Sequence, residues 1–212
     1  MKGWTLTRIE RPEDADDPLT VDYIRDQHLR AANGTAEDTY IDSLRKVSLN
    51  AAEHRTGRLL LPQTWLLSRD CVPPCLEIEL PIAPIQSVDA ITYVDVNGAV
   101  QTFGGSPSPW TLVNPTVESN RLATIRLAYN QVWPVTRSEP GAFRVMVTVG
   151  YPVVNSGSPA VGIVAIPDDI QHGRLLVIGE LYKQRSESVH ASNQNPAIRG
   201  ANSLWDNWRV FV

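Results

Sequence analysis

The hydrophobic periodicity of the chain changes at Thr56-Gly57-Arg58, and this change constrains the fold more than any other feature. Before it, apolar or small residues recur at steps of three and four, which predicts an amphipathic helix over about 36–56. Those positions are Tyr40, Ile41, Leu44, Val47, Ser48, Ala51 and Ala52. Gly57 suits the left-handed conformation that ends many helices. The chain must therefore pass from a long helix directly into another kind of structure.

Short strands are predicted to follow this helix. Segments rich in β-branched and aromatic residues, separated by Pro, Gly and Asn, are typical of strands. They cover residues 64–68, 76–80, 87–94, 110–113, 122–127 and 143–149. Asn97-Gly98, which stands between two alternating segments, is a strong hairpin pattern. Residues from about 59 to 150 are therefore predicted to form a small antiparallel β insertion.

Two further helices are predicted on either side of this insertion. Thr20 can cap a helix over about 21–31. A second helix over about 167–185 begins with a proline and two acidic residues, which suit the first turn and the positive end of the helix dipole. Glycine weakens a helix interior, so Gly173 and Gly179 indicate close packing against another helix.

The predicted fold class is α+β. It consists of a three-helix core bundle, with helices at about 20–57 and 167–186, that is interrupted by the β insertion at about 59–150. Extended arms are predicted at both termini. In this scheme residues 1–187 form the main domain and residues 188–212 form a C-terminal arm.

Composition narrows the classes of partner and compartment. The formal net charge is −4, whereas a protein that holds a nucleic-acid backbone needs an excess of Lys and Arg; an acidic wall can still let DNA slide past. Cys71 and Cys75 cannot complete a four-ligand zinc site. We expect them to be free thiols in a reducing compartment, with a loop disulfide as the alternative. No apolar signal core or membrane-spanning run is present in the sequence, so we expect a soluble protein made in a cytoplasm.

The residue pattern gives no catalytic constellation. A catalytic site brings a nucleophile, a base and an orienting group into one cleft, but the four histidines are scattered. His54 beside Glu53, and His172 near two carboxylates, are interpreted as surface or cap contacts. The acidic run at 13–17 is interpreted as a solvated arm. We therefore predict no enzymatic activity, no cofactor and no metal.

Basic residues are frequent along the first two predicted helices. They could form a positive stripe that faces DNA or an acidic partner. The acidic balance of the chain favours solvated faces and intersubunit ion pairs instead. The residues are Arg25, Arg30, Arg45, Lys46, Arg55 and Arg58.

An aromatic segment closes the chain after a polar linker. Termini are usually polar and frayed, yet this one contains Trp205, Trp208, Arg209 and Phe211. Aromatic residues and arginine dominate the hot spots of protein interfaces. These four residues are therefore candidates for docking onto another subunit, and the alternative is that the segment folds back on its own domain.

Several motifs follow one another in a characteristic order. They are the Thr56-Gly57-Arg58 helix end, the Gln63-Thr64-Trp65 strand, Leu80-Pro81 with Pro84, Ser87-Val88 and Ile91-Thr92-Tyr93, then Val149-Gly150-Tyr151-Pro152, Ile166–Ile170, Leu181–Arg185 and Trp208-Arg209. In order and spacing, over about residues 19–187, this resembles the head–tail connector (adaptor) proteins of tailed bacteriophages, a family also seen in phage-derived particles. The chain departs from the shorter members in its 152–163 insertion, predicted to be a flexible excursion, and in its 186–202 linker.

The resemblance implies a virion structural protein at the head–tail junction, assembled in the bacterial cytoplasm. It would form a homo-oligomeric ring, usually of twelve copies, below the portal protein. The ring would extend the DNA channel, pass DNA without sequence-specific binding and contact a downstream neck or tail protein. The aromatic segment would then dock onto the portal or an adjacent copy. The alternatives are another neck ring protein, such as a stopper or tail terminator, and a carbohydrate-binding module.

Overall fold

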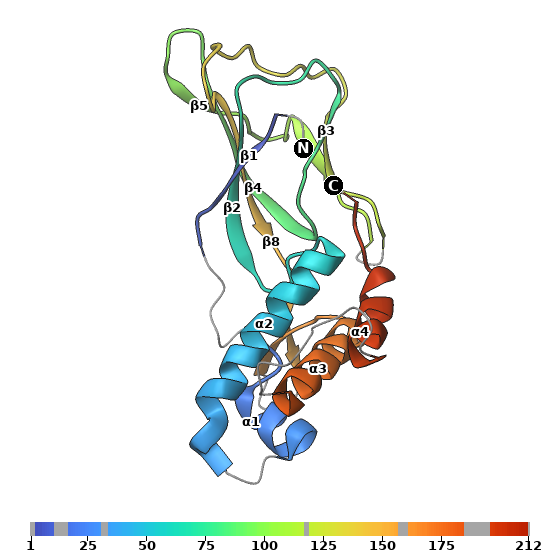
Figure 1. Cartoon of the computed structure of the whole chain (residues 1–212). Helices are drawn as coiled ribbons and strands as arrows, with labels where there is room; N and C mark the ends of the chain where they lie inside the picture. Colours follow the sequence, from blue (N-terminus) through green and yellow to red (C-terminus); the bar gives the residue numbers. More distant parts are fainter. Residues whose placement is uncertain are drawn as a thin grey trace. The chain divides into compact units, whose positions relative to one another are not determined.

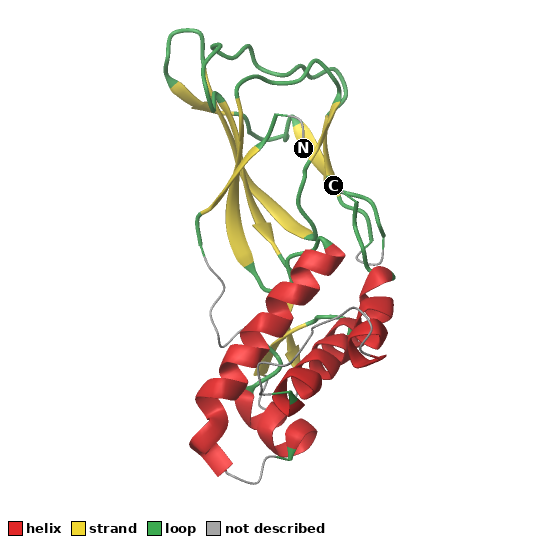
Figure 2. Ribbon diagram, in the orientation of Figure 1, coloured by secondary structure: helices red, strands yellow, loops and turns green. Residues whose placement is uncertain are grey.

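A computed structural model describes residues 3–10, 17–30, 34–116, 119–156, 161–184 and 196–211 (Figure 1). The chain forms two compact units, each built from segments that are distant in the sequence. The β unit comprises Met1–Pro12, Leu61–Pro152 and Val210–Val212, and the helical unit comprises Glu13–Leu60 and Val153–Arg209. Figure 2 shows the division between helices and strands.

The helical unit is built around α2 (Asp38–Thr56) and α3 (Asp168–Lys183). Short helical segments precede α2: α1 (Val21–Tyr23), the π-helical η2 (Ile24–Leu29) and the 3₁₀ turn η3 (Gly34–Glu37). The helix α4 (Pro196–Asp206) packs against α3, and the hairpin of β9 (Val153–Ser156) and β10 (Val161–Val164) completes the unit.

Local chemistry sets the helix ends as the sequence predicted. The Thr20 hydroxyl accepts a hydrogen bond from the Tyr23 amide at 3.2 Å, which caps α1. Gly57 ends α2 at a φ of 68°, with its amide donating to the Glu53 carbonyl at 2.9 Å. Apolar residues from three segments then form the core of the unit. They are Leu19, Ile24, Ile41, Leu44 and Ile178.

The β unit contains a five-stranded antiparallel sheet in the order β1-β2-β8-β4-β5. Its strands are β1 (Thr5–Arg8), β2 (Gln63–Arg69), β4 (Ile85–Val94), β5 (Val100–Thr102) and β8 (Phe143–Val149). A three-stranded sheet in the order β3-β7-β6 accompanies it. Its strands are β3 (Glu77–Glu79), β6 (Trp110–Val113) and β7 (Thr124–Leu127).

The central strand β8 shows why the larger sheet is stable. Alternate residues of β8 point into the core and are fully buried, namely Phe143, Val145, Val147 and Val149. Val145 lies opposite Leu67 on β2 and opposite Ile91 on β4, and both of these partners are buried. The strand period predicted from the sequence is therefore confirmed, and so is the mixed α+β class.

Several sequence-based expectations need correction. Part of the extended N-terminal arm belongs to the sheet, because β1 pairs with β2 along Thr5–Arg8. The excursion predicted at 152–163 contains the hairpin β9–β10. Residues 196–206 of the predicted C-terminal arm form α4 in the same compact unit as α3, so the three-helix core is incomplete without it. The arm residues 188–195 lie outside the described residues.

Candidate docking surface

Trp205, the first aromatic residue of the candidate docking segment, lies inside the helical unit. Its side chain is 2% exposed, and its indole Nε1 donates to the Ile170 carbonyl of α3 at 3.1 Å. A Cβ added at Gly173 would stand 2.3 Å from that nitrogen, so only glycine leaves room for the ring. The alternative that the segment folds back on its own domain therefore holds for Trp205, and the close helix packing expected at Gly173 is confirmed.

Trp208 lies at the margin of the same unit. Its carbonyl accepts a hydrogen bond from Arg58 Nε at 2.6 Å, and the Arg58 guanidinium carbon is 6.0 Å from the centre of the indole ring. The ring is half-buried, and among the described residues its Nε1 has no hydrogen-bond partner. The end of α2 thus holds the turn that follows α4 through both the backbone and the aromatic face.

Arg209 and Phe211 present their side chains at the surface. Arg209 is exposed, and Phe211 is 73% exposed. Just before them, Arg55 of α2 pairs with Asp206 of α4 at 2.6 Å, which raises the pKa of the Arg55 guanidinium above its ordinary value. The candidate set therefore divides by burial: Trp205 is buried against α3, Trp208 is half-buried, and Arg209 and Phe211 are exposed.

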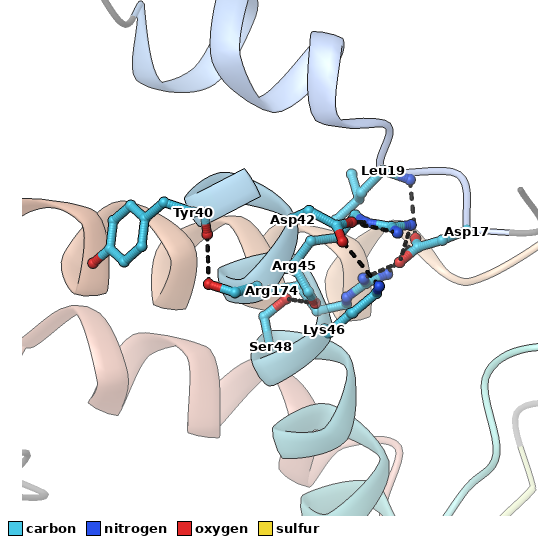
Figure 3. Close-up of polar contacts among 9 residues, drawn as sticks. Asp17, Leu19, Tyr40, Asp42, Arg45, Lys46, Ser48 and Arg174 are labelled. Carbon is cyan, nitrogen blue, oxygen red and sulfur yellow. Dashed lines mark hydrogen bonds and ion pairs between the residues drawn. The ribbon is translucent and has the colours of Figure 1, made fainter. Parts of the chain in front are cut away.

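A buried ionic cluster joins the segment before α1 to α2 and α3 (Figure 3). Arg174 of α3 is fully buried and binds Asp17 through two hydrogen bonds of 2.9 and 2.6 Å. Arg45 of α2 approaches the same carboxylate at 3.4 Å, and the Leu19 amide donates to it at 3.1 Å. Bidentate geometry and the additional donors offset the desolvation of these charges.

The cluster continues onto the surface of α2. Asp42 accepts hydrogen bonds from Arg45 at 2.9 and 2.7 Å and lies 2.9 Å from Lys46 Nζ. The hydrogen bond from Lys46, together with those from Arg45, lowers the pKa of Asp42 despite its partial burial. Asp42 therefore remains charged and orients the Arg45 guanidinium toward Asp17.

These contacts correct two interpretations of charge. Asp17 is not part of a solvated arm, since it is 3% exposed, and residues 13–16 lie outside the described residues. The basic residues are largely committed within the chain. Arg25 reaches Asp22, Asp26 and Asp38 at 2.8, 2.7 and 2.9 Å, while Arg45, Lys46, Arg55 and Arg58 have the partners given above.

The histidines and cysteines do not assemble a reactive centre in the described part of the chain. The His28 Nε2 lies 2.8 Å from the Leu175 carbonyl, and burial lowers the pKa of this imidazole. Glu53 accepts from the Leu60 amide at 2.8 Å, which ties the segment after Gly57 to the last turn of α2. Cys71 and Cys75 are exposed free thiols. The described residues contain no cluster of three potential metal ligands, and no described helix is long and apolar enough to cross a bilayer.

Among known proteins, the chain is similar to solved structures in its fold. No protein-family model matches the chain, and no curated protein matches it. Solved structures do. One chain, from the neck of an empty GTA particle computed with C6 symmetry, superposes with a TM-score of 0.73 at 22% identity, covering 98% of this chain and 96% of that one.

Two further matches come from the same kind of particle. A chain from the virion of a native gene transfer agent (GTA) particle gives a TM-score of 0.71 at 23% identity, covering 98% of this chain and 96% of that one. A chain from the neck of a native GTA particle computed with C12 symmetry gives 0.64 at 21% identity, with 96% of each chain covered. Both units of this chain are therefore included in the shared fold.

Proposed function

We propose that this chain is a structural protein of the neck of a tailed-phage-like particle. The observation that carries the proposal is the fold match over 98% of this chain to a chain of a GTA neck. The match spans 96% of that chain as well, so the likeness is not confined to one common motif. A structural role agrees with the residues described above, whose charged groups are used in internal pairing.

More particularly, the chain acts as the head–tail connector, or adaptor, which forms a ring beneath the portal. The motif order described above supports this role, and two of the matching neck structures have C6 and C12 symmetry. A heterologous interface closes into a ring when its rotation divides the circle, and twelve copies fit the C12 case. With a net charge of −4, such a ring passes DNA by weak repulsion instead of binding its backbone.

The C-terminal residues supply the contact to the portal in this proposal. Trp205 fixes α4 on α3, and the Arg58 contact fixes the following turn. Arg209, which follows this turn, and Phe211 are both exposed, so a partner can contact their side chains. A large exposed aromatic residue two positions after an arginine has the composition of an interface hot spot.

Cryo-electron microscopy of the particle neck, or of the purified chain mixed with portal rings, tests the role. We expect twelve copies directly below the portal, around a continuous channel. Density in a lower ring would identify a stopper or terminator instead, and absence from the neck would refute the proposal.

A variant pair tests the docking residues. Phe211→Ala is expected to weaken portal binding about 30-fold, the loss typical of a hot spot. Tyr23→Ala is the control, because Tyr23 is an aromatic residue 46% exposed on α1. Equal affinities for the two variants would remove Phe211 from the contact.

A further inference from the structure

Six of the exposed large apolar side chains described in the β unit lie on the β2–β3 loop, the β4–β5 hairpin and the β7–β8 connection. We call them the apolar rim: Leu76, Val96, Val100, Tyr129, Val132 and Val135, which are 67%, 64%, 63%, 99%, 79% and 75% exposed. The β2–β3 loop, the β4–β5 turn and the β7–β8 connection that carry them lie at one end of the β unit (Figure 1). Scattered exposed apolar residues are ordinary, but such a concentration at one end is not.

The rim is held in place by an aromatic anchor. The Trp133 indole donates from Nε1 to the Cys75 carbonyl at 2.7 Å. Its ring centroid is 5.4 Å from that of Phe103 and 5.9 Å from that of Phe143, the latter edge-on. The Arg137 amide also donates to the Val94 carbonyl at 3.0 Å. The β7–β8 connection is therefore held by contacts at Trp133 and Arg137, and its exposed side chains lose little conformational entropy when a partner binds.

A shallow pocket opens within the rim. Its volume is about 390 Å³, and its lining includes Pro73, Pro74, Leu76, Val132, Trp133 and Pro134. Leu76 and Val132 belong to both the pocket and the rim, so the pocket opens beside this part of the rim. The pocket is large enough to accept an aromatic side chain.

The six rim side chains are uncharged, and the charged groups beside them have partners within the chain: Arg137, which approaches Gly98, pairs with Glu139 at 3.4 Å, and Asp95 accepts from the Asn97 and Ala99 amides. Residues 71–76, 96–100 and 128–136 contain no Asp, Glu, Lys or Arg. Copies of a chain with a net charge of −4 repel one another, so an uncharged apolar surface is where identical copies can meet without opposing like charges. At roughly 100 Å² for each side chain, the rim presents on the order of 600 Å², near the roughly 800 Å² per partner of a stable interface.

We propose that the apolar rim is a contact between copies of this chain, with Tyr129 of one copy packed against the Trp133 pocket of the next. Tyrosine suits this position because its ring fills an apolar pocket while its hydroxyl reaches the wet margin. This inference rests on the proposed ring function and names the surface through which adjacent copies touch.

Sedimentation velocity of the purified chain over a range of concentrations gives the first test. We expect species heavier than the 23.5 kDa monomer, and we expect Val132→Asp to weaken self-association at least about 30-fold. Val113→Asp is the matched control, since Val113 is 47% exposed on β6 of the same unit but outside the rim. If Val113→Asp weakens association as much as Val132→Asp, the rim is not the contact.

A second test covers the case in which copies of this chain associate only on the portal, and it uses crosslinking from a thiol in the pocket to identify what binds there. Cys75 lines the pocket and is exposed, so a photo-crosslinker can be attached to it in a Cys71→Ser background. In necks assembled on portal rings, we expect an adduct of two copies of this chain, which Tyr129→Asp should abolish. An adduct with a different neck protein, or none, overturns the rim proposal. The adaptor role is judged separately, by the position of the chain in the neck density.

Discussion

Gly173→Ala is expected to destabilise the helical unit, although the same substitution stabilises most helices. In an exposed helix interior, alanine is favoured over glycine by about 1 kcal/mol. At Gly173, however, the new Cβ would stand 2.3, 2.8 and 3.0 Å from three atoms of the Trp205 indole. Overpacking of this kind costs about 1–3 kcal/mol. Displacing the ring also loses its hydrogen bond to the Ile170 carbonyl, which adds about 1 kcal/mol. The net loss is therefore about 1–3 kcal/mol.

The reasoning predicts a change of sign when the tryptophan is removed. Trp205→Ala alone should cost about 3–5 kcal/mol, because it empties a buried site. In that background Gly173→Ala no longer meets the ring, so it should be neutral or stabilising by up to about 1 kcal/mol. Two residues in contact are expected to show such coupling in a double-mutant cycle.

Thermal and urea unfolding followed by far-ultraviolet circular dichroism measures these effects. Each kcal/mol corresponds to roughly 4–8 °C in Tm for a unit of about 100 residues. Gly200→Ala on α4 is the control, because its added Cβ would be an ordinary 3.6 Å from Leu176, and it should stabilise slightly. If Gly173→Ala raised the Tm as Gly200→Ala does, the proposed packing of Trp205 would be refuted.

Three further predictions concern buried charge, backbone conformation and pH. Asp17→Ala should lower the free energy of unfolding by about 3–5 kcal/mol, because it leaves Arg174 buried without its carboxylate partner. Replacing both residues of the pair, by Leu and Met, should recover most of this loss. A double variant that is as unstable as Asp17→Ala in urea unfolding would contradict this account. Gly150→Ala should destabilise the β unit by at least about 2 kcal/mol, since the φ of Gly150 is 101° and an added Cβ would lie 2.3 Å from the Leu61 carbonyl oxygen. Normal expression and an unchanged Tm would contradict this prediction and show that the turn relaxes. The hydrogen bond from Lys46 lowers the pKa of Asp42 in the folded state. The contribution of the Asp42 carboxylate to stability is therefore present above its unfolded pKa of about 3.9, and it is lost as pH falls through the lower folded pKa. Asp42→Asn should therefore be less stable than the wild type at neutral pH, by less than about 1 kcal/mol for this partly exposed group, and the gap should close toward pH 2.

Local patterns predicted the elements well. Three predictions that depend on residues close in sequence are confirmed: the end of α2 at Gly57, the β4–β5 hairpin around Asn97-Gly98 and the strand at 143–149. Capping, turn chemistry and strand period act over a few residues, so they are visible without tertiary structure. The start of α3 was predictable for the same reason.

Non-local partners were not predictable. Asp17 and Arg174 are 157 positions apart, and nothing in the acidic run distinguishes the one carboxylate that becomes buried. The position of Trp205 could not be derived from its own segment, because its partners Ile170 and Gly173 belong to another helix. Gly173 was the available clue: a glycine inside a helix predicts a close neighbour, but it does not say which one. The rim was missed because Tyr129 and Val132 have no periodic pattern and resemble an ordinary connection.

The interrupted construction of the helical unit has a consequence for synthesis. The helix α2 ends at Thr56 and α3 begins at Asp168, so about 110 residues must be made between the two. At roughly 5–20 residues per second, synthesis of α3 begins on the order of 6–20 seconds after synthesis of α2 has ended. The strands from β2 to β8 emerge during that interval and can pair with one another at once. Until α3 leaves the ribosome, Leu19 and Ile24 are the only members of the core cluster of the helical unit from outside α2 that have been made, so Ile41 and Leu44 lack the cover of Ile178 and α2 is open to premature association.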